Sequence, residues 1–125
     1  MKISAKLALS FLLPAIVLTG CSKKADTNKP IEQVEAEAQK MTLNDLQSTA
    51  QAYAKEITAK KSDAQKVTDQ IKTISPTELF GEKAKSLKSE MEKVGAEVNA
   101  LSQRYEIYLK KYQELGGDLS KVQVQ

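Results

Sequence analysis

Two long stretches of the sequence carry apolar residues at alternating steps of three and four, and we call these residues the seam positions. The first stretch contains Leu43, Leu46, Ala50, Tyr53, Ile57, Lys60, Ala64, Val67, Ile71 and Ile74. The second contains Phe80, Ala84, Leu87, Met91, Val94, Val98, Leu101, Tyr105, Tyr108, Tyr112 and Leu115. Such steps average about 3.5 residues, the period of a left-handed coiled coil, and strand alternation fits neither stretch. The pattern predicts an all-α fold.

A short turn signal separates the two stretches. Residues 75–78 read Ser-Pro-Thr-Glu, which combines a serine cap, proline at the first helical position and glutamate at the third. Gly116 and Gly117 follow the second stretch, as glycine often follows a helix. We therefore expect helices of about 31–74 and 76–115, paired as a long antiparallel coiled-coil hairpin that spans 31–117. The tail, 118–125, is expected to be frayed.

The seam positions allow two registers for this hairpin. Facing residue numbers sum to 151 in one register and to 158 in the other. The first places Ala64 opposite Leu87, so that a small seam residue meets a larger one, and it centres the bend on the predicted cap. The second places Tyr53 opposite Tyr105. We expect the first register.

The start of the first helix carries a second cap signal. Pro30 suits the start of a helix, and the residues after it have helical spacing as far as Met41. Thr42 is followed three residues later by Asp45, as in a capping box. A break or bend near 41–42 would make 31–41 a short separate N-terminal helix.

The first twenty residues have the three parts of a secretory signal. Lys2 and Lys6 form a basic start, an uncharged and mostly apolar run covers 7–19, and the run ends in small residues. The alternative is a membrane-spanning helix, which needs about 20 apolar residues. This run is shorter and contains Pro14, so we expect residues 1–20 to be a cleaved signal.

The only cysteine of the chain follows this run directly. The segment Leu-Thr-Gly-Cys, residues 18–21, resembles the lipobox of bacterial lipoproteins. The resemblance implies cleavage between Gly20 and Cys21, a thioether-linked diacylglycerol on Cys21 and an acyl group such as palmitate on its amine. Two or more acyl chains hold a protein firmly on a membrane, whereas one chain binds marginally. It further implies a periplasmic, membrane-anchored protein, with the outer membrane favoured because Ser22, not Asp, follows the cysteine. Residues 21–30 are expected to be a flexible lipidated tether.

The charge balance and the residue types of the chain argue against several classes of function. Residues 1–20 contain no acidic side chain, so the rest of the chain has 17 basic and 16 acidic side chains. This balance argues against nucleic acid as a partner, because nucleic-acid binders carry a clear basic excess. The chain has no histidine, and Cys21 is assigned to the lipid. We therefore expect no catalytic residue, no metal site and no cofactor other than the covalent lipid.

Two features of the predicted hairpin are candidates for interactions. Lys60 is the one charged seam residue, and it either fixes register with its ammonium group in water or contacts an acidic partner. The second feature is a cluster near the end of the second helix, which the topology would place beside the tether. We expect it to form a membrane-proximal collar at lipid headgroups, composed of Tyr105, Ile107, Tyr108, Leu109, Lys110, Lys111 and Tyr112.

These features indicate a non-enzymatic scaffold or adaptor of the bacterial envelope. Its expected partners are membrane lipids and an envelope protein, and pairing of two hairpins into a four-helix bundle would give a homodimer. The plan of lipobox, tether and heptads resembles the murein lipoprotein, whose family uses a C-terminal lysine for attachment to the wall. This sequence ends at Gln125, so no covalent attachment to the wall is expected. The alternative function is a periplasmic chaperone-like module that binds unfolded clients or a ligand.

Overall fold

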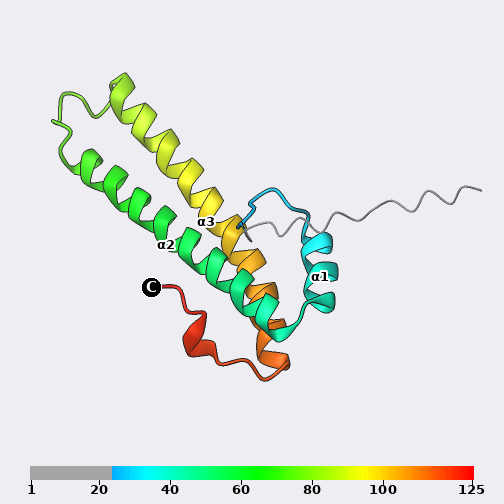
Figure 1. The fold of residues 1–125 in the computed structure, drawn as a ribbon. Coiled ribbons are helices and arrows are strands. Elements are labelled where there is room, and N and C mark those ends of the chain that lie inside the picture. The colour runs from blue at the N-terminus through cyan, green and yellow to red at the C-terminus, as the bar shows by residue number, and fades with distance from the viewer. Residues whose placement is uncertain (1–23) are drawn as a thin grey trace, which may run out of the picture.

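The computed structural model describes residues 24–125 (Figure 1). The predicted signal, its cleavage site and Cys21 lie outside the described residues. The described chain contains helices but no strand: α1 (Ile31–Lys40), α2 (Leu43–Lys72), α3 (Glu82–Glu114) and the 3-10 helix η1 (Leu119–Lys121). Helices α2 and α3 pack antiparallel along their length, and α1 packs on α3. The all-α hairpin and the short extra N-terminal helix are therefore confirmed.

The break between α1 and α2 occurs where the sequence predicts it. The Thr42 hydroxyl accepts a hydrogen bond from the Asp45 backbone N–H at 3.2 Å, and the Asp45 carboxylate accepts one from the Thr42 N–H at 3.4 Å. This capping box begins α2 at Leu43. The chain reverses there, and α1 buries Val34 and Ala38 against α3.

The register of the hairpin is close to the alternative that we did not favour. The Lys60 ammonium lies 2.7 Å from the Glu97 carboxylate, which corresponds to a sum of 157. The Tyr112 hydroxyl donates to the Gln47 side chain at 3.3 Å, which corresponds to a sum of 159. The expected register of 151 is therefore wrong, because the connection between the helices is longer than the tight bend on which that expectation depended.

That connection also corrects the predicted start of the second helix. The Glu78 N–H donates to the Ser75 carbonyl at 2.9 Å, so residues 75–78 form one turn. The Ser75 hydroxyl binds the Glu78 carboxylate at 3.1 Å instead of capping a backbone N–H. The turn does not propagate, and α3 begins only at Glu82, after Gly81. A helix over 76–81 would gain little, because Phe80 has no core beside it.

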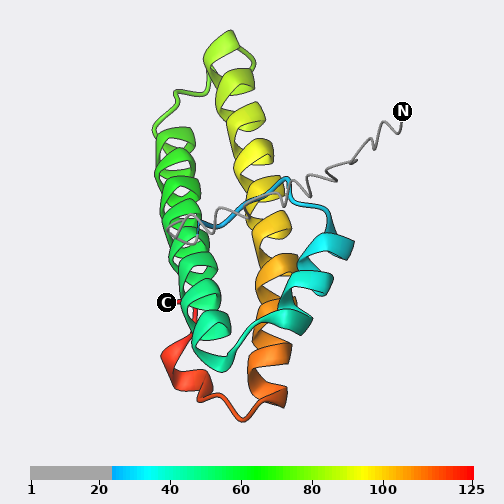
Figure 2. The ribbon, with the colours of Figure 1, turned by 45° about the vertical axis from the view of Figure 1, so that its right-hand side comes forward.

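The tail is packed, and not frayed as expected. Gly116 has φ +83°, a left-handed conformation, and a Cβ on Gly117 would lie 2.4 Å from the Tyr112 ring. These two glycines let the chain fold back along the hairpin (Figure 2). There Val122 is buried and its carbonyl accepts a hydrogen bond from the Tyr105 hydroxyl.

The buried residues form two separate clusters. The base cluster lies where α1, α2, α3 and the tail meet, and consists of Val34, Ala38, Leu46, Ala50, Tyr53, Ile57, Leu101, Tyr108, Tyr112 and Val122. The distal cluster lies near the connection between α2 and α3, and consists of Val67, Ile74 and Leu87. Figure 2 shows the same division: only α2 and α3 continue into the upper part of the molecule.

Candidate functional site

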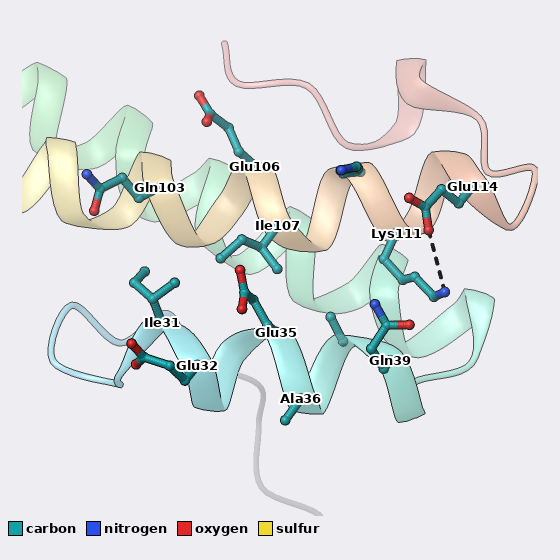
Figure 3. A pocket seen from close by; sticks show the side chains of 12 residues that line it. Ile31, Glu32, Glu35, Ala36, Gln39, Gln103, Glu106, Ile107, Lys111 and Glu114 are labelled. Carbon is teal, nitrogen blue, oxygen red and sulfur yellow. Dashed lines mark hydrogen bonds and ion pairs between the residues drawn. The ribbon is translucent and has the colours of Figure 1, made fainter.

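A groove between α1 and α3 has a volume of about 910 Å³. Figure 3 shows the side chains of both helices that line it. Helix α1 contributes Ile31, Glu32, Glu35, Ala36, Ala38 and Gln39, and α3 contributes Gln103, Glu106, Ile107, Lys110, Lys111 and Glu114. We call this surface the α1–α3 groove.

The groove has an apolar floor and an acidic rim. Ile31 and Ile107 extend toward each other from the two helices (Figure 3), and both are half-buried. The rim carries four glutamates against two lysines, and Lys111 pairs with Glu114 at 3.5 Å. The remaining glutamates, Glu32, Glu35 and Glu106, are exposed. The site thus offers apolar contact area together with excess negative charge.

A buried arginine holds the segment that leads into the groove. Arg104 is 7% exposed, and its Nε and Nη2 donate to the Lys29 carbonyl at 2.9 and 2.6 Å. Its Nη1 donates to the Ala100 carbonyl at 2.7 Å. The planar guanidinium therefore joins α3 to the residue just before Pro30, the cap of α1. We call this contact the arginine clamp.

A second polar contact fixes the inner side of α1. The Glu37 carboxylate accepts hydrogen bonds from Lys29 at 2.7 Å, from Gln33 at 3.0 Å and from the Tyr108 hydroxyl at 3.4 Å. Burial alone would raise the pKa of Glu37, but these hydrogen bonds and the Lys29 charge together lower it below its usual value. Burial raises the pKa of Tyr108, and the neighbouring Glu37 carboxylate and Tyr53 side chain add to this effect. The arginine clamp and Glu37 together pre-organise the α1–α3 groove.

The residues of the predicted collar do not form one surface. Tyr108 and Tyr112 are each 1% exposed and belong to the base cluster, so the prediction that they meet lipid headgroups is wrong. Burial raises the pKa of the half-buried Tyr105, whose hydroxyl is bound by the tail. Leu109 packs against the base cluster. The other three members, Ile107, Lys110 and Lys111, line the α1–α3 groove.

The described part of the predicted tether is also bound to the hairpin. The Asp26 N–H donates to the Tyr53 hydroxyl at 3.2 Å, and that hydroxyl donates to the Asp26 carbonyl at 3.3 Å. Residues 24–30 therefore lie beside Tyr53 and Arg104, partway along the hairpin, and not at the end where α2 begins. The premise of the predicted collar, that the tether meets the hairpin at this end, is therefore wrong, because α1 reverses the chain.

Lys60 has its acidic partner within the chain. The hydrogen bond to Glu97 raises the pKa of Lys60, and both side chains of this pair are about a quarter exposed. The ion pair joins α2 to α3 at one position along the seam. The ammonium group is thus paired within the chain instead of lying in water, and a role of Lys60 in fixing register stays a prediction.

Sequence reasoning missed the arginine clamp and the acidic rim. The clamp joins residues 75 positions apart, and Arg104 lies beside the seam without a distinctive pattern. A signal for the rim was available, because Glu32 and Glu35 are three residues apart and so share one side of a short helix. The fold was needed to place Glu106 opposite them.

Comparisons of this chain with protein families, curated proteins and solved structures gave no match. Within residues 24–125, no helix has the length and apolar character that crossing a membrane requires. The same residues contain no group of three or more acidic, histidine or cysteine side chains arranged to hold a metal ion.

Proposed function

We propose that this protein is a membrane-anchored, non-catalytic adaptor of the bacterial envelope that binds a basic amphipathic helix of a partner protein. The α1–α3 groove is the observation that supports this function. Its apolar floor suits the apolar face of a helix, and its glutamates suit lysines or arginines at the edges of that face. Hydrogen bonds from Arg104 and Tyr108 hold α1 against α3, so a partner would meet a formed site.

The length of the groove limits the size of the bound segment. Helix α1 has 10 residues and is about 15 Å long. A partner helix would therefore contact the groove over two to three turns, and its apolar side chains would pack on Ile31 and Ile107. Glu32 and Glu35 would face one edge of that helix, and Glu106 the other.

The proposed membrane anchor is the lipobox cysteine. Cys21 precedes Lys24 by three residues, and an extended chain spans at most about 3.6 Å per residue. A lipid on Cys21 would therefore attach within about 11 Å of Lys24. Residues 24–30 cross the hairpin near Tyr53, so we expect a bilayer that holds this lipid to lie beside the flank of the base half. We favour the outer membrane because Ser22 follows the cysteine.

A pair of designed peptides tests the groove. Residues 22–125 would be titrated against a labelled 18-residue amphipathic peptide of leucine and lysine, and against its leucine and glutamate counterpart. We expect fluorescence anisotropy to show binding of the basic peptide, weakened by salt, and much weaker binding of the acidic peptide.

Matched charge variants locate the binding site. The triple variant Glu32→Gln, Glu35→Gln and Glu106→Gln should weaken binding of the basic peptide about tenfold or more. The control, Glu82→Gln, Glu90→Gln and Glu92→Gln, removes the same charge from exposed positions outside the groove and should bind as the native chain does. Equal losses in the two variants, or equal binding of an unfolded non-helical polypeptide, would contradict the proposal. The second result would favour a chaperone-like function.

A further inference from the structure

Residues 24–30, which lead from the proposed lipid site to α1, are held against the hairpin by polar contacts, and we call them the docked tether. The Tyr53 hydroxyl bonds to both the N–H and the carbonyl of Asp26, at 3.2 and 3.3 Å. The arginine clamp holds the Lys29 carbonyl, and the Lys29 ammonium pairs with Glu37 at 2.7 Å. The docked tether is thus bound to all three helices, since these partners lie on α2, α3 and α1.

Helix α1 continues directly from the docked tether. The Pro30 carbonyl accepts hydrogen bonds from the Gln33 and Val34 N–H groups, at 3.1 and 3.0 Å, so the first turn of α1 follows the arginine clamp without a gap. The whole helix has 10 residues, of which Val34 and Ala38 are buried. Isolated helices shorter than about 12 residues are marginal in water. Helix α1 therefore depends on the contacts that the docked tether makes at its N-terminal end.

Helix α2 has a cap of its own that does not involve α1. The capping box of Thr42 and Asp45 closes the first turn of α2 with groups that lie at the start of that helix. This turn can therefore stay formed when α1 leaves the hairpin. Loss of the docked tether would release residues 24–42 and leave α2 and α3 paired.

We propose that the docked tether is a latch that makes the α1–α3 groove sensitive to the distance between the hairpin and the membrane. This inference rests on the proposed function of the groove and on the proposed lipid of Cys21. While the tether is docked, three residues join Cys21 to Lys24, at most about 11 Å of chain. A larger separation pulls the tether from Tyr53 and from the arginine clamp, and α1 then unfolds.

Release of α1 would remove one wall of the groove. Helix α1 supplies Glu32 and Glu35 of the acidic rim and Ile31 of the apolar floor. The released residues 24–42 would span at most about 68 Å at about 3.6 Å per residue, so the hairpin would reach much farther from the bilayer. Coupling between two sites is reciprocal. A partner in the groove would therefore keep the tether docked and the hairpin close to the membrane.

Single-molecule pulling from the lipid attachment point tests the latch. The chain from Cys21 to Gln125, which contains every residue that the structure describes, would carry one handle on Cys21 and one on Lys88→Cys, an exposed position of α3. We expect a first step at low force that adds the contour length of residues 24–42, at most about 68 Å, before α2 and α3 separate. A first step of about 25 Å would mean that 24–30 leave without α1, and would overturn the proposal. A single step that unfolds the whole chain would also overturn it.

Two tyrosine variants provide a matched comparison. Tyr53→Phe removes the hydroxyl that binds Asp26, and Tyr112→Phe removes a hydroxyl that binds the tail at the Asp118 N–H. Both tyrosines are 1% exposed, both variants keep the ring in the base cluster, and circular dichroism would check that the helices persist. At a fixed force, Tyr53→Phe should speed the first step about tenfold, and Tyr112→Phe should leave its rate unchanged. Equal rates of the first step in the two variants would overturn the latch.

The basic peptide separates failure of the latch from failure of the proposed function. If both hold, a saturating concentration of the leucine and lysine peptide should slow the first step about tenfold. If the peptide binds in the absence of force but does not slow the step, the tether does not control the groove and the inference is overturned. If the peptide does not bind while the first step keeps its length and its dependence on Tyr53, the proposed function fails and the release of α1 by the tether stands.

Discussion

The base half and the distal half of the hairpin are built from the same two helices but differ in what surrounds them. In the base half, α1 and the tail cover α2 and α3, and Leu46, Ala50 and Leu101 are completely buried. In the distal half, α2 and α3 have only each other, and Leu87 and Ile74 keep 7% and 9% of their surface exposed. A two-helix seam alone leaves its edges in contact with water, whereas added segments close it. We infer that most of the stability resides in the base half.

The contrast extends to the surfaces of the two halves. The α1–α3 groove lies in the base half, where the arginine clamp and Glu37 tie α1 to α3. The exposed Leu79 and Phe80 lie at the end of the distal half, where only the hydrogen bonds of the connection order the chain. The four predictions below test this contrast, beginning with the largest expected effect.

Leucine truncation compares the two clusters directly. Leu101→Ala should lower the free energy of unfolding by about 4 kcal/mol, since it leaves a cavity where all four segments meet, and Leu87→Ala by about 2 kcal/mol. Urea unfolding of residues 22–125 would measure both. Equal losses at the two positions would remove the distinction between the halves.

Removal of the arginine clamp should loosen only the base half. Arg104→Ala deletes both hydrogen bonds to the Lys29 carbonyl and should cost about 2 kcal/mol. Arg104→Lys keeps the charge but not the planar fork, so it should restore only part of this loss. Hydrogen exchange should show lost protection in α1 and unchanged protection at Val67 and Leu87. Lost protection from exchange in the distal half as well would show that the arginine clamp supports the whole hairpin.

Alkaline pH should destabilise the base half through Tyr108. The folded-state pKa of Tyr108 lies above its ordinary value of 10.0, so its contribution to stability is complete below pH 10 and is lost as the pH rises further. Tyr108→Phe keeps the ring that packs on Tyr53 at 5.4 Å between ring centroids and removes the ionisable group. This variant should lose less stability than the native chain between about pH 10 and pH 12. If Tyr108→Phe and the native chain lose the same amount of stability over this pH range, groups other than Tyr108 cause the loss.

Acidic pH should produce the smallest effect. The folded-state pKa of Glu37 lies below its ordinary value of 4.5, so its contribution is present above pH 4.5 and is lost as the pH falls below it. The carboxylate is a third exposed, so we expect less than about 1 kcal/mol. Glu37→Gln should reduce the loss of stability on acidification, measured by urea unfolding at pH 7 and pH 3. Glu92→Gln, an exposed glutamate on α3, is the control and should behave as the native chain.

The features that the sequence predicted correctly are those set by residues close together in the chain. Seam positions from Leu43 to Leu115 predicted the hairpin, and Thr42 with Asp45 predicted the break before α2. Both depend on helical periodicity or on capping within a single turn. Such signals are complete within a few residues, so no knowledge of the tertiary fold is needed.

The features that the sequence did not predict depend on contacts between distant segments. Heptads repeat every seven residues, so the registers of 151 and 158 satisfy the same seam pattern. The tail lacks helical periodicity, and its packing depends on contacts with distant residues, such as the hydrogen bond from Tyr105 to Val122. The collar failed for a related reason: its position was inferred from a straight first helix, and the reversal of α1 moved residues 24–30 to the flank.

Hydrogen exchange resolved along residues 22–125 tests the central claim most directly, because it reports the protection of each segment in a single experiment. If the base half is a closed four-segment unit, α1 and the backbone around Val122 will be protected together with Leu46 and Leu101, and protection will fall toward residues 73–81. If α1 and the tail instead exchange as free chain while protection is uniform along α2 and α3, the molecule is a bare hairpin and the pre-organised groove does not exist.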